Sequence, residues 1–308
     1  MSKLYQDRDR EFIDYQLYEL DGLTLRGPQS SSPNGIAYLG AAQTFGTYCE
    51  DPFPTIIGRT LGIGTMNLGR GGAGPDFFLT SRDSETLLGI ANRARLVVVQ
   101  VMSGRSINNS AFFSGLGISR GHRLPDGLPM RSEQVWLDLF FGTDKRGNDP
   151  EFLRKLIEEN SRAYVEKMVQ LLNKISVPKI LFWFSERAPD DYRFPSQQRL
   201  EELKFSRTMR GRFSAKVLYK LGMWDRSPKP SLLGQFPHLV TEQMLEMIRP
   251  FADAFVECST PAGMPQPLRN SQGVTVNYNR YYPSPEMHRQ AAEKLLPICK
   301  AMLESSSG

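Results

Sequence analysis

Side chains able to act as a general acid or base are few in this chain and lie far apart in sequence. It has three histidines, His122, His238 and His288, and no two have the spacing of a metal-binding pair. His288 stands near the start of an amphipathic segment and is the first candidate for a general base, with His238 second; a capping role is the alternative for His288. Glu186 follows an apolar run and is the candidate catalytic carboxylate. The sequence predicts no metal site.

Polar and glycine-rich clusters follow four short apolar runs. Glycine lets a ligand approach the backbone closely, and arginine can hold an anion with two hydrogen bonds. These clusters therefore predict a ligand-binding site, with ordinary tight turns and a surface ion pair as the alternatives. The candidate binding residues are Gln43, Thr44, Gly69, Arg70, Gly71, Arg105, Ser106, Asn108, Asn109 and Arg187.

A strongly basic segment occupies residues 204–229. It has eight basic residues and one acidic residue, whereas the whole chain has a formal net charge of only +5. Arg207, Arg210 and Arg212 are candidates for a patch that binds an anionic ligand. A solvated helical face is the alternative.

The elements that must position these residues alternate along the chain. Buried strands are expected where short runs are rich in β-branched and aromatic residues, and helices where apolar residues recur every three or four positions. Such alternation is typical of a parallel sheet covered on both faces, in which ligands bind beyond the carboxyl ends of the strands. The predicted strands are 36–39, 65–68, 96–101, 179–184 and 254–258, and the predicted helices are 53–61, 84–94, 150–174, 241–252 and 285–303.

The length of 308 residues and the 40% hydrophobic content fit one large folded domain. We expect a lead-in segment over residues 1–35, a single α/β domain over 36–303 and a flexible tail over 304–308. The domain is expected to have insertions near 103–148 and 186–235; the first has no sustained periodicity and looks like a long functional loop region.

The cysteine count, the apolar runs and the net charge exclude several classes of protein and partner. Three widely spaced cysteines predict neither a disulfide framework nor a zinc cluster. No apolar run approaches the roughly 20 residues of a membrane helix, and the charged start does not resemble a signal peptide. The modest positive charge does not indicate a nucleic-acid partner. A cytoplasmic protein with a small-molecule or glycan substrate is expected.

Three blocks of the sequence resemble those of SGNH (GDSL-type) hydrolases. Residues 38–46, Tyr-Leu-Gly-Ala-Ala-Gln-Thr-Phe-Gly, are similar to the first block, Leu-Gly-Asp-Ser-x-Thr-x-Gly. Residues 65–74 contain Asn-Leu-Gly-x-x-Gly-x-Gly, and residues 282–297 resemble the last block with its following helix. The chain is most similar to a little-characterised bacterial branch. The resemblance implies an SGNH/flavodoxin-like three-layer sandwich with a central, mostly parallel sheet and loop and helical insertions.

The chain departs from this family at all three positions of its catalytic triad. Ala42 stands where the family has its serine, Asn279 where it has its aspartate, and Tyr282 where it has its histidine. Because an alanine cannot attack a carbonyl carbon, the family's acyl-serine mechanism cannot run here. Thr44 or Ser103 as a substitute nucleophile is the alternative.

Three kinds of function remain open. The first is direct transfer of a sulfo or acyl group to an acceptor hydroxyl, which needs a base and positioning but no serine nucleophile. The resemblance to SGNH-like transferases implies a donor carrying 3′-phosphoadenosine, either the activated sulfate donor PAPS or acyl-CoA. The second is a catalytically inactive pseudo-hydrolase that binds a glycan, lipid or protein partner. The third is a hydrolase or esterase with a rebuilt site.

Overall fold

A parallel sheet of five strands forms the centre of the molecule. The computed structural model describes residues 9, 11–29, 34–202, 232–261, 266–279 and 281–305. The strands of the sheet lie in the order β10-β9-β5-β3-β4, which in chain order is 2-1-3-4-5, the flavodoxin-like arrangement. The predicted α/β fold class is therefore confirmed. The strands are β3 (Ile36–Leu39), β4 (Thr65–Asn67), β5 (Leu96–Gln100), β9 (Lys179–Ser185) and β10 (Ala254–Ser259).

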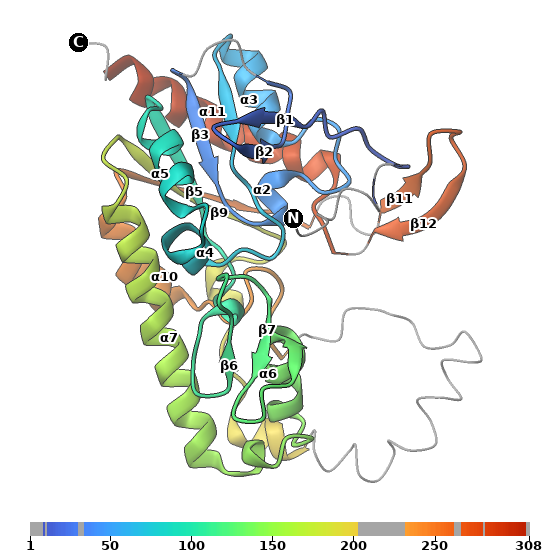
Figure 1. Cartoon of the computed structure of the whole chain (residues 1–308), viewed down its shortest axis with the longest axis vertical. Helices are drawn as coiled ribbons and strands as arrows, with labels where there is room; N and C mark the ends of the chain where they lie inside the picture. Colours follow the sequence, from blue (N-terminus) through green and yellow to red (C-terminus); the bar gives the residue numbers. More distant parts are fainter. Residues whose placement is uncertain are drawn as a thin grey trace.

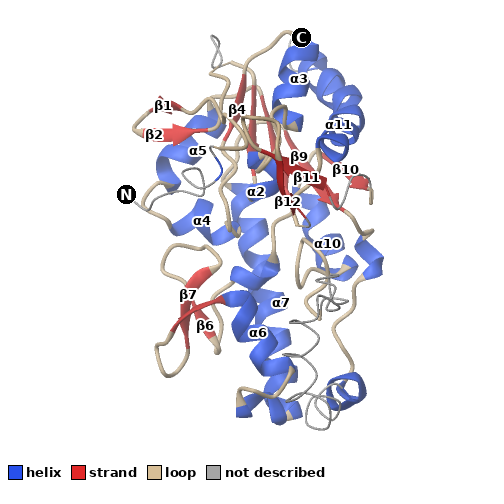
Figure 2. Ribbon diagram, turned by 90° about the vertical axis from the view of Figure 1, so that its right-hand side faces the viewer, coloured by secondary structure: helices blue, strands red, loops and turns tan. Residues whose placement is uncertain are grey.

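Helices cover both faces of this sheet, as Figure 2 shows. Because successive strand residues point to opposite faces, Val98 and Phe182 pack toward one helical layer and Val97 and Leu181 toward the other. These alternating residues build two separate apolar cores, as a three-layer sandwich requires. One layer consists of α3 (Phe53–Leu61) and α11 (Pro285–Ser305), and the other of α4 (Pro75–Thr80), α5 (Ser84–Asn92), α7 (Pro150–Asn173) and α10 (Glu242–Ile248).

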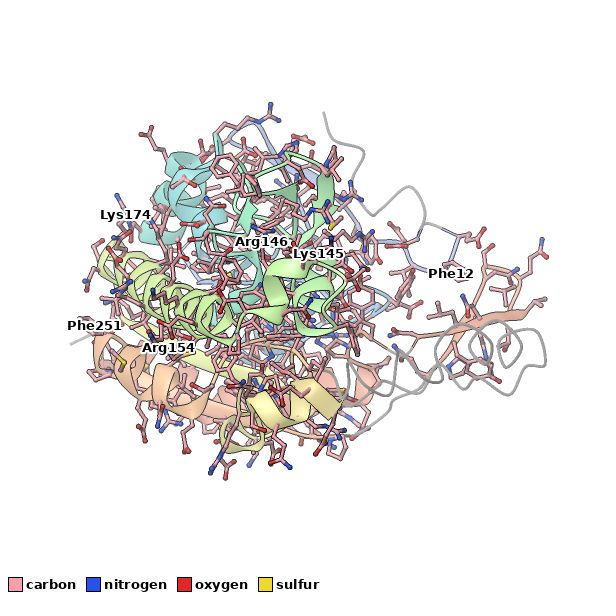
Figure 3. The ribbon with its side chains drawn as sticks, turned by 90° about the horizontal axis from the view of Figure 1, so that it is seen from below. Phe12, Lys145, Arg146, Arg154, Lys174 and Phe251 are labelled. Atoms are coloured by element: carbon pink, nitrogen blue, oxygen red, sulfur yellow. The ribbon has the colours of Figure 1, made fainter. Side chains whose placement is uncertain are left out.

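The long helix α7 begins where the sequence predicts it. Asp149 caps its first turn by accepting a hydrogen bond from the Glu151 backbone N–H at 2.9 Å, and Pro150 occupies the first helical position. Charged side chains occupy its outer side, among them Arg154, which pairs with Glu151 and Glu158 (Figure 3). Its apolar residues are buried in two cores: Leu153 and Leu156 in the lower one, and Tyr164 and Met168 against the sheet. The helix therefore joins the sheet to the layer beneath it.

Residues 103–148 form an ordered lower layer below the carboxyl ends of the strands (Figure 1). They pack around a third apolar core that includes Phe112, Trp136 and Leu153. The expectation of a long loop region is wrong here, because strands of two to four residues separated by glycine and proline leave no periodic pattern to detect. The lower layer consists of η1 (Gly104–Ser106), β6 (Phe112–Phe113), β7 (Arg120–Arg123), β8 (Pro129–Arg131), α6 (Ser132–Phe140) and η2 (Lys145–Asn148), with η3 (Pro189–Asp191) following β9.

The described part of the predicted lead-in segment is attached to the body of the protein. Arg26 is buried and donates hydrogen bonds to the backbone carbonyls of Gly27, Cys49 and Glu50. Within the described ranges, no helix combines the length and apolar character needed to cross a membrane. The remaining elements are β1 (Tyr18–Leu20), β2 (Leu23–Leu25), α2 (Ala42–Phe45), η4 (Arg249–Phe251) and a projecting hairpin of β11 (Gln266–Arg269) and β12 (Thr275–Asn279) (Figure 1).

Candidate functional site

A cleft of about 300 Å³ lies at the carboxyl ends of β3 and β5. These two neighbouring strands flank the point where the strand order reverses, which is where open α/β sheets bind ligands. The lower layer and the segment before α11 close the other sides. The cleft is lined by Ala41, Ala42 and Gln43 after β3; Gly72 and Ala73 after β4; Ser103, Arg105 and Ser106 after β5; Ser119, Arg131 and Glu133 of the lower layer; and Phe236, Tyr281 and Tyr282.

The three residues that the resemblance aligns with the SGNH triad lie in one region of the structure. Ala42 and Tyr282 both line the cleft. Asn279 holds the chain beside it: its side-chain amide donates to the Tyr282 carbonyl at 2.8 Å, and its Oδ1 accepts from the Tyr281 and Tyr282 backbone N–H groups at 3.0 and 2.9 Å. Ala42, which the resemblance aligns with the family's serine, has only a methyl group, and Asn279 shapes the loop that brings two tyrosines to the cleft.

Ser103 and His238 form the nearest approach to a nucleophile–base pair. Ser103 Oγ is 3.2 Å from His238 Nδ1, and the other ring nitrogen, Nε2, is 3.4 Å from an Arg105 Nη1. A guanidinium only donates hydrogen bonds, so this contact favours the tautomer with the proton on Nδ1. That proton then points toward Ser103, and the imidazole cannot take the serine proton in this arrangement.

His238 is buried behind the wall of the cleft, and among the described residues no carboxylate forms a hydrogen bond with its ring. Burial, together with the positive charges of Arg105 and Arg187, holds its pKa well below the usual range, so the ring is neutral. A catalytic triad places a carboxylate next to the base to stabilise the imidazolium that forms, whereas a cation here opposes it. The geometry does not favour a rebuilt acyl-serine hydrolase.

Arg105 is the most strongly anchored charge in the cleft wall. Its side chain is only 11% exposed, and it pairs with Glu133 at 3.1 Å. It also donates to the Tyr281 hydroxyl at 3.1 Å, and the Tyr281 ring stacks on the His238 ring. Contacts from three places therefore fix the direction of the guanidinium. They come from α6, from the loop of residues 235–240 (the His238 loop) and from the segment before α11.

Some buried side-chain oxygens at the cleft form no hydrogen bond with the described part of the chain. They are Gln43 Oε1 and Ser106 Oγ, on side chains that are more than nine-tenths buried. Buried polar groups in folded proteins are almost always paired, so an unpaired group at a cleft points to a ligand or water as its partner. Three predicted residues, Gln43, Arg105 and Ser106, therefore meet at this cleft.

Other predicted residues near the first two strands form hydrogen bonds within the protein instead. The Thr44 hydroxyl donates to Gln100 Oε1 at 2.7 Å, and the Gly69 N–H donates to Asn67 Oδ1 at 3.0 Å. Arg70 donates through its backbone N–H to the Gly40 carbonyl at 2.9 Å, and burial lowers the pKa of its half-buried side chain. Thr44, Gly69, Arg70 and Gly71 do not line the cleft; Gly72 and Ala73, next along the chain, do.

The two predicted asparagines also lie outside the cleft lining. Asn108 Oδ1 accepts the Ser114 backbone N–H at 2.6 Å. Asn109 donates to Asn160 Oδ1 at 3.0 Å and accepts from the backbone N–H of Ala111. Both amides form hydrogen bonds within the protein, so the predicted role of Asn108 and Asn109 in ligand binding does not agree with their placement.

Arg187 is buried beneath the His238 loop and does not reach the cleft. Its guanidinium lies 4.8 Å from the centre of the Trp183 ring, and burial lowers its pKa to about 10. The predicted role in donor binding does not agree with this placement; Arg187 positions the loop. Neighbouring Glu186 is half-buried, its pKa raised by desolvation, and it does not line the cleft. The guanidinium donates to the carbonyls of Ala188, Pro189, Gln235, Pro237 and Val240.

His288 lies in the apolar core between β9, α3 and α11. It is fully buried, its ring stacks on Phe53 and contacts Phe184, and its Nδ1 accepts the Phe53 backbone N–H at 3.3 Å. Burial lowers its pKa to about 3. The predicted role as general base does not agree with this position, since the ring is outside the cleft lining. In the described residues, no group of three His, Cys, Asp or Glu side chains could hold a metal ion.

The contribution of the lower layer leaves no recognisable pattern in the sequence. Ser119, Arg131 and Glu133 line the cleft, but they stand in the region without periodicity, and nothing in the pattern distinguishes them. Tyr281, next to a triad position, could have been found from its neighbour. Arg207, Arg210 and Arg212 lie outside the described residues.

One family model is similar to part of the chain, a little over a third of its length. A family model described as a domain of unknown function (DUF6473) matches residues 1–114. No curated protein matches the chain. The matched region includes β3, β4 and β5, and therefore both strand ends that carry the cleft.

Several solved structures that are similar to this chain at low identity are described as esterases or lipases. A carbohydrate esterase family 2 enzyme from Corynascus thermopiles (Myceliophthora fergusii) is 13% identical, with a TM-score of 0.41 over 92% of this chain and 70% of that one. The lipase Lip_vut3 from a goat rumen metagenome is 10% identical, with a TM-score of 0.40 over 87% and 97%. A Desulfitobacterium hafniense protein described as lipolytic and of the G-D-S-L family is 11% identical, with a TM-score of 0.30 over 86% and 99%. These likenesses concern the fold alone. The strand order is that of a flavodoxin-like α/β scaffold, and the three sequence blocks resemble those of SGNH hydrolases.

Proposed function

We propose that the cleft binds a small anionic ligand that also carries hydroxyl groups, with Arg105 as its main contact. The observation that carries this proposal is the Arg105 guanidinium, fixed in the cleft wall beside the alanine that replaces the nucleophile. Arginine suits carboxylate, sulfate and phosphate groups because its planar fork can donate two parallel hydrogen bonds. Gln43 Oε1 and Ser106 Oγ support it, since a ligand hydroxyl could donate to either.

Exchanging Arg105 for glutamine is expected to weaken binding of such a ligand about tenfold or more, because a charged hydrogen bond contributes about 1.5 to 3 kcal/mol. Calorimetric titration with sulfate, glucuronate and adenosine 3′,5′-bisphosphate checks this, with unfolding free energies measured in parallel. Arg154→Gln is the matched control, since Arg154 also pairs with glutamates but is exposed on α7. Equal affinities in the two variants would contradict the proposal.

A second candidate is direct group transfer from a 3′-phosphoadenosine donor, PAPS or acyl-CoA, to an acceptor hydroxyl of a small molecule or glycan. The contact between Ser103 Oγ and His238 Nδ1 favours it, because it links the cleft to a neutral imidazole. A bound anion that draws Arg105 away from Nε2 would release the other tautomer. The acceptor oxygen would then attack the sulfur or carbonyl carbon, the donor phosphate or thiolate would leave, and the proton would pass through Ser103 to His238.

Replacing Ser103 with alanine separates the two candidates. If transfer occurs, Ser103→Ala should lose most of it while retaining donor binding, since the variant breaks only the route for the proton. Transfer from PAPS and from acetyl-CoA to a panel of sugars is the assay, and thermal stabilisation by adenosine 3′,5′-bisphosphate or CoA reports binding. Wild-type protein that neither compound stabilises at millimolar concentration would reject group transfer and leave the binding proposal standing.

A further inference from the structure

We propose that Arg120 and Arg131, on adjacent strands of the lower layer, form a phosphate-binding subsite at the rim of the cleft. The inference rests on the proposed function and deepens it, since it names the ligand as a phosphorylated small molecule. Arg131 lines the cleft, and Arg120 is its direct partner on the neighbouring strand. The subsite therefore extends the same cleft toward the lower layer.

The register of the small sheet places the two arginines side by side. Strands β7 and β8 are antiparallel, and Arg120 pairs directly with Arg131. Directly opposite residues of an antiparallel pair point to the same face, with their Cβ atoms about 5 Å apart. Both residues are exposed. Two guanidinium groups can thus approach a single anion from neighbouring strands.

This pairing is electrostatically unfavourable without a ligand. Like charges directly opposite each other destabilise a sheet. Within the described ranges, neither side chain has an ion pair or hydrogen bond, whereas Arg123 of the same strand pairs with Asp126. The acidic residue at the cleft, Glu133, already pairs with Arg105. Two positive charges therefore remain without a partner at the cleft rim, where an anion would compensate them.

The chemistry of two adjacent arginines favours a phosphoryl group over a carboxylate. A phosphate monoester carries about −1.5 to −2 charges at neutral pH and offers three acceptor oxygens, enough for two guanidinium forks. A carboxylate has one negative charge and satisfies one fork.

The test compares a phosphorylated ligand with its carboxylate counterpart. Glucose 6-phosphate and glucuronate differ mainly in having a phosphate or a carboxylate group. Inorganic phosphate and adenosine 3′,5′-bisphosphate are added to compare free phosphate and a nucleotide phosphate with the sugar phosphate. Calorimetry is done on wild type, Arg120→Gln and Arg131→Gln. Arg123→Gln is the matched control, since residue 123 lies on the same strand but points to the other face.

Each of the first two variants should weaken binding of the phosphorylated ligand about tenfold and change that of glucuronate little. Arg120→Gln should also keep or raise the melting temperature, because it removes a repulsion; a merely structural arginine would lower it. If both variants bind phosphate as Arg123→Gln does while Arg105→Gln loses binding, the subsite is refuted and the proposed function stands. If wild type binds none of the ligands, both proposals fail.

Discussion

Replacing Arg187 with methionine is expected to lower the free energy of unfolding by about 3 kcal/mol or more. The side chain is only 5% exposed and donates hydrogen bonds to five backbone carbonyls, three of them in residues 235–240. A buried polar group left without its partner costs about 1 to 3 kcal/mol, so two stranded carbonyls already account for this loss. Equilibrium denaturation with urea measures it.

Two further variants serve as a control and as a partial replacement for Arg187. Arg193→Met removes an exposed arginine from the same region and should change stability by no more than about 0.5 kcal/mol. Arg187→Lys keeps the charge but has three donors in place of five, so it should recover only part of the loss. A wild-type unfolding curve for Arg187→Met would show that Arg187 does not hold the His238 loop.

The sheet and its helices could be predicted because each leaves a local pattern. The run Leu96–Gln100 is entirely buried and reads as a strand, and helix α7 has both an apolar stripe and a capping aspartate. The lower layer could not be predicted in this way. Its strands are too short to show a period, and its core forms only where α6 packs against the first turns of α7 and the distant Tyr192 and Leu239.

The position of the candidate site in the fold could be predicted, but not which residues line it. Strand ends identify the edge where ligands bind, and Gln43, Arg105 and Ser106 indeed meet there. Which neighbour faces the cleft depends on turn geometry that sequence does not show: Gly72 lines it and Gly71 does not. The partners of Arg105 are 28 and 176 residues away in sequence, so only the folded chain brings Glu133 and Tyr281 to it.

Acidification to about pH 5 is expected to cost the wild type about 2 kcal/mol of stability through His288 alone. The native pKa of about 3 lies below the ordinary value of 6.5, because burial among Phe53 and Phe184 disfavours the charged ring. Between these two values the unfolded chain binds more protons than the folded one. Stability therefore rises with pH across this window and no longer depends on His288 above it.

Denaturant unfolding at about pH 7.5 and pH 5 tests this with His288→Asn, whose amide oxygen can still accept the Phe53 N–H. The variant should lose about 2 kcal/mol less than wild type between the two conditions. Phe53→Leu is the control: it loosens the same packing but keeps the titrating ring, so it should lower stability at both pH values and retain the wild-type difference. If His288→Asn and wild type respond alike to acid, the imidazole is not held neutral in the core. That outcome would mean that solvent reaches the ring, and His288 would again be a candidate base.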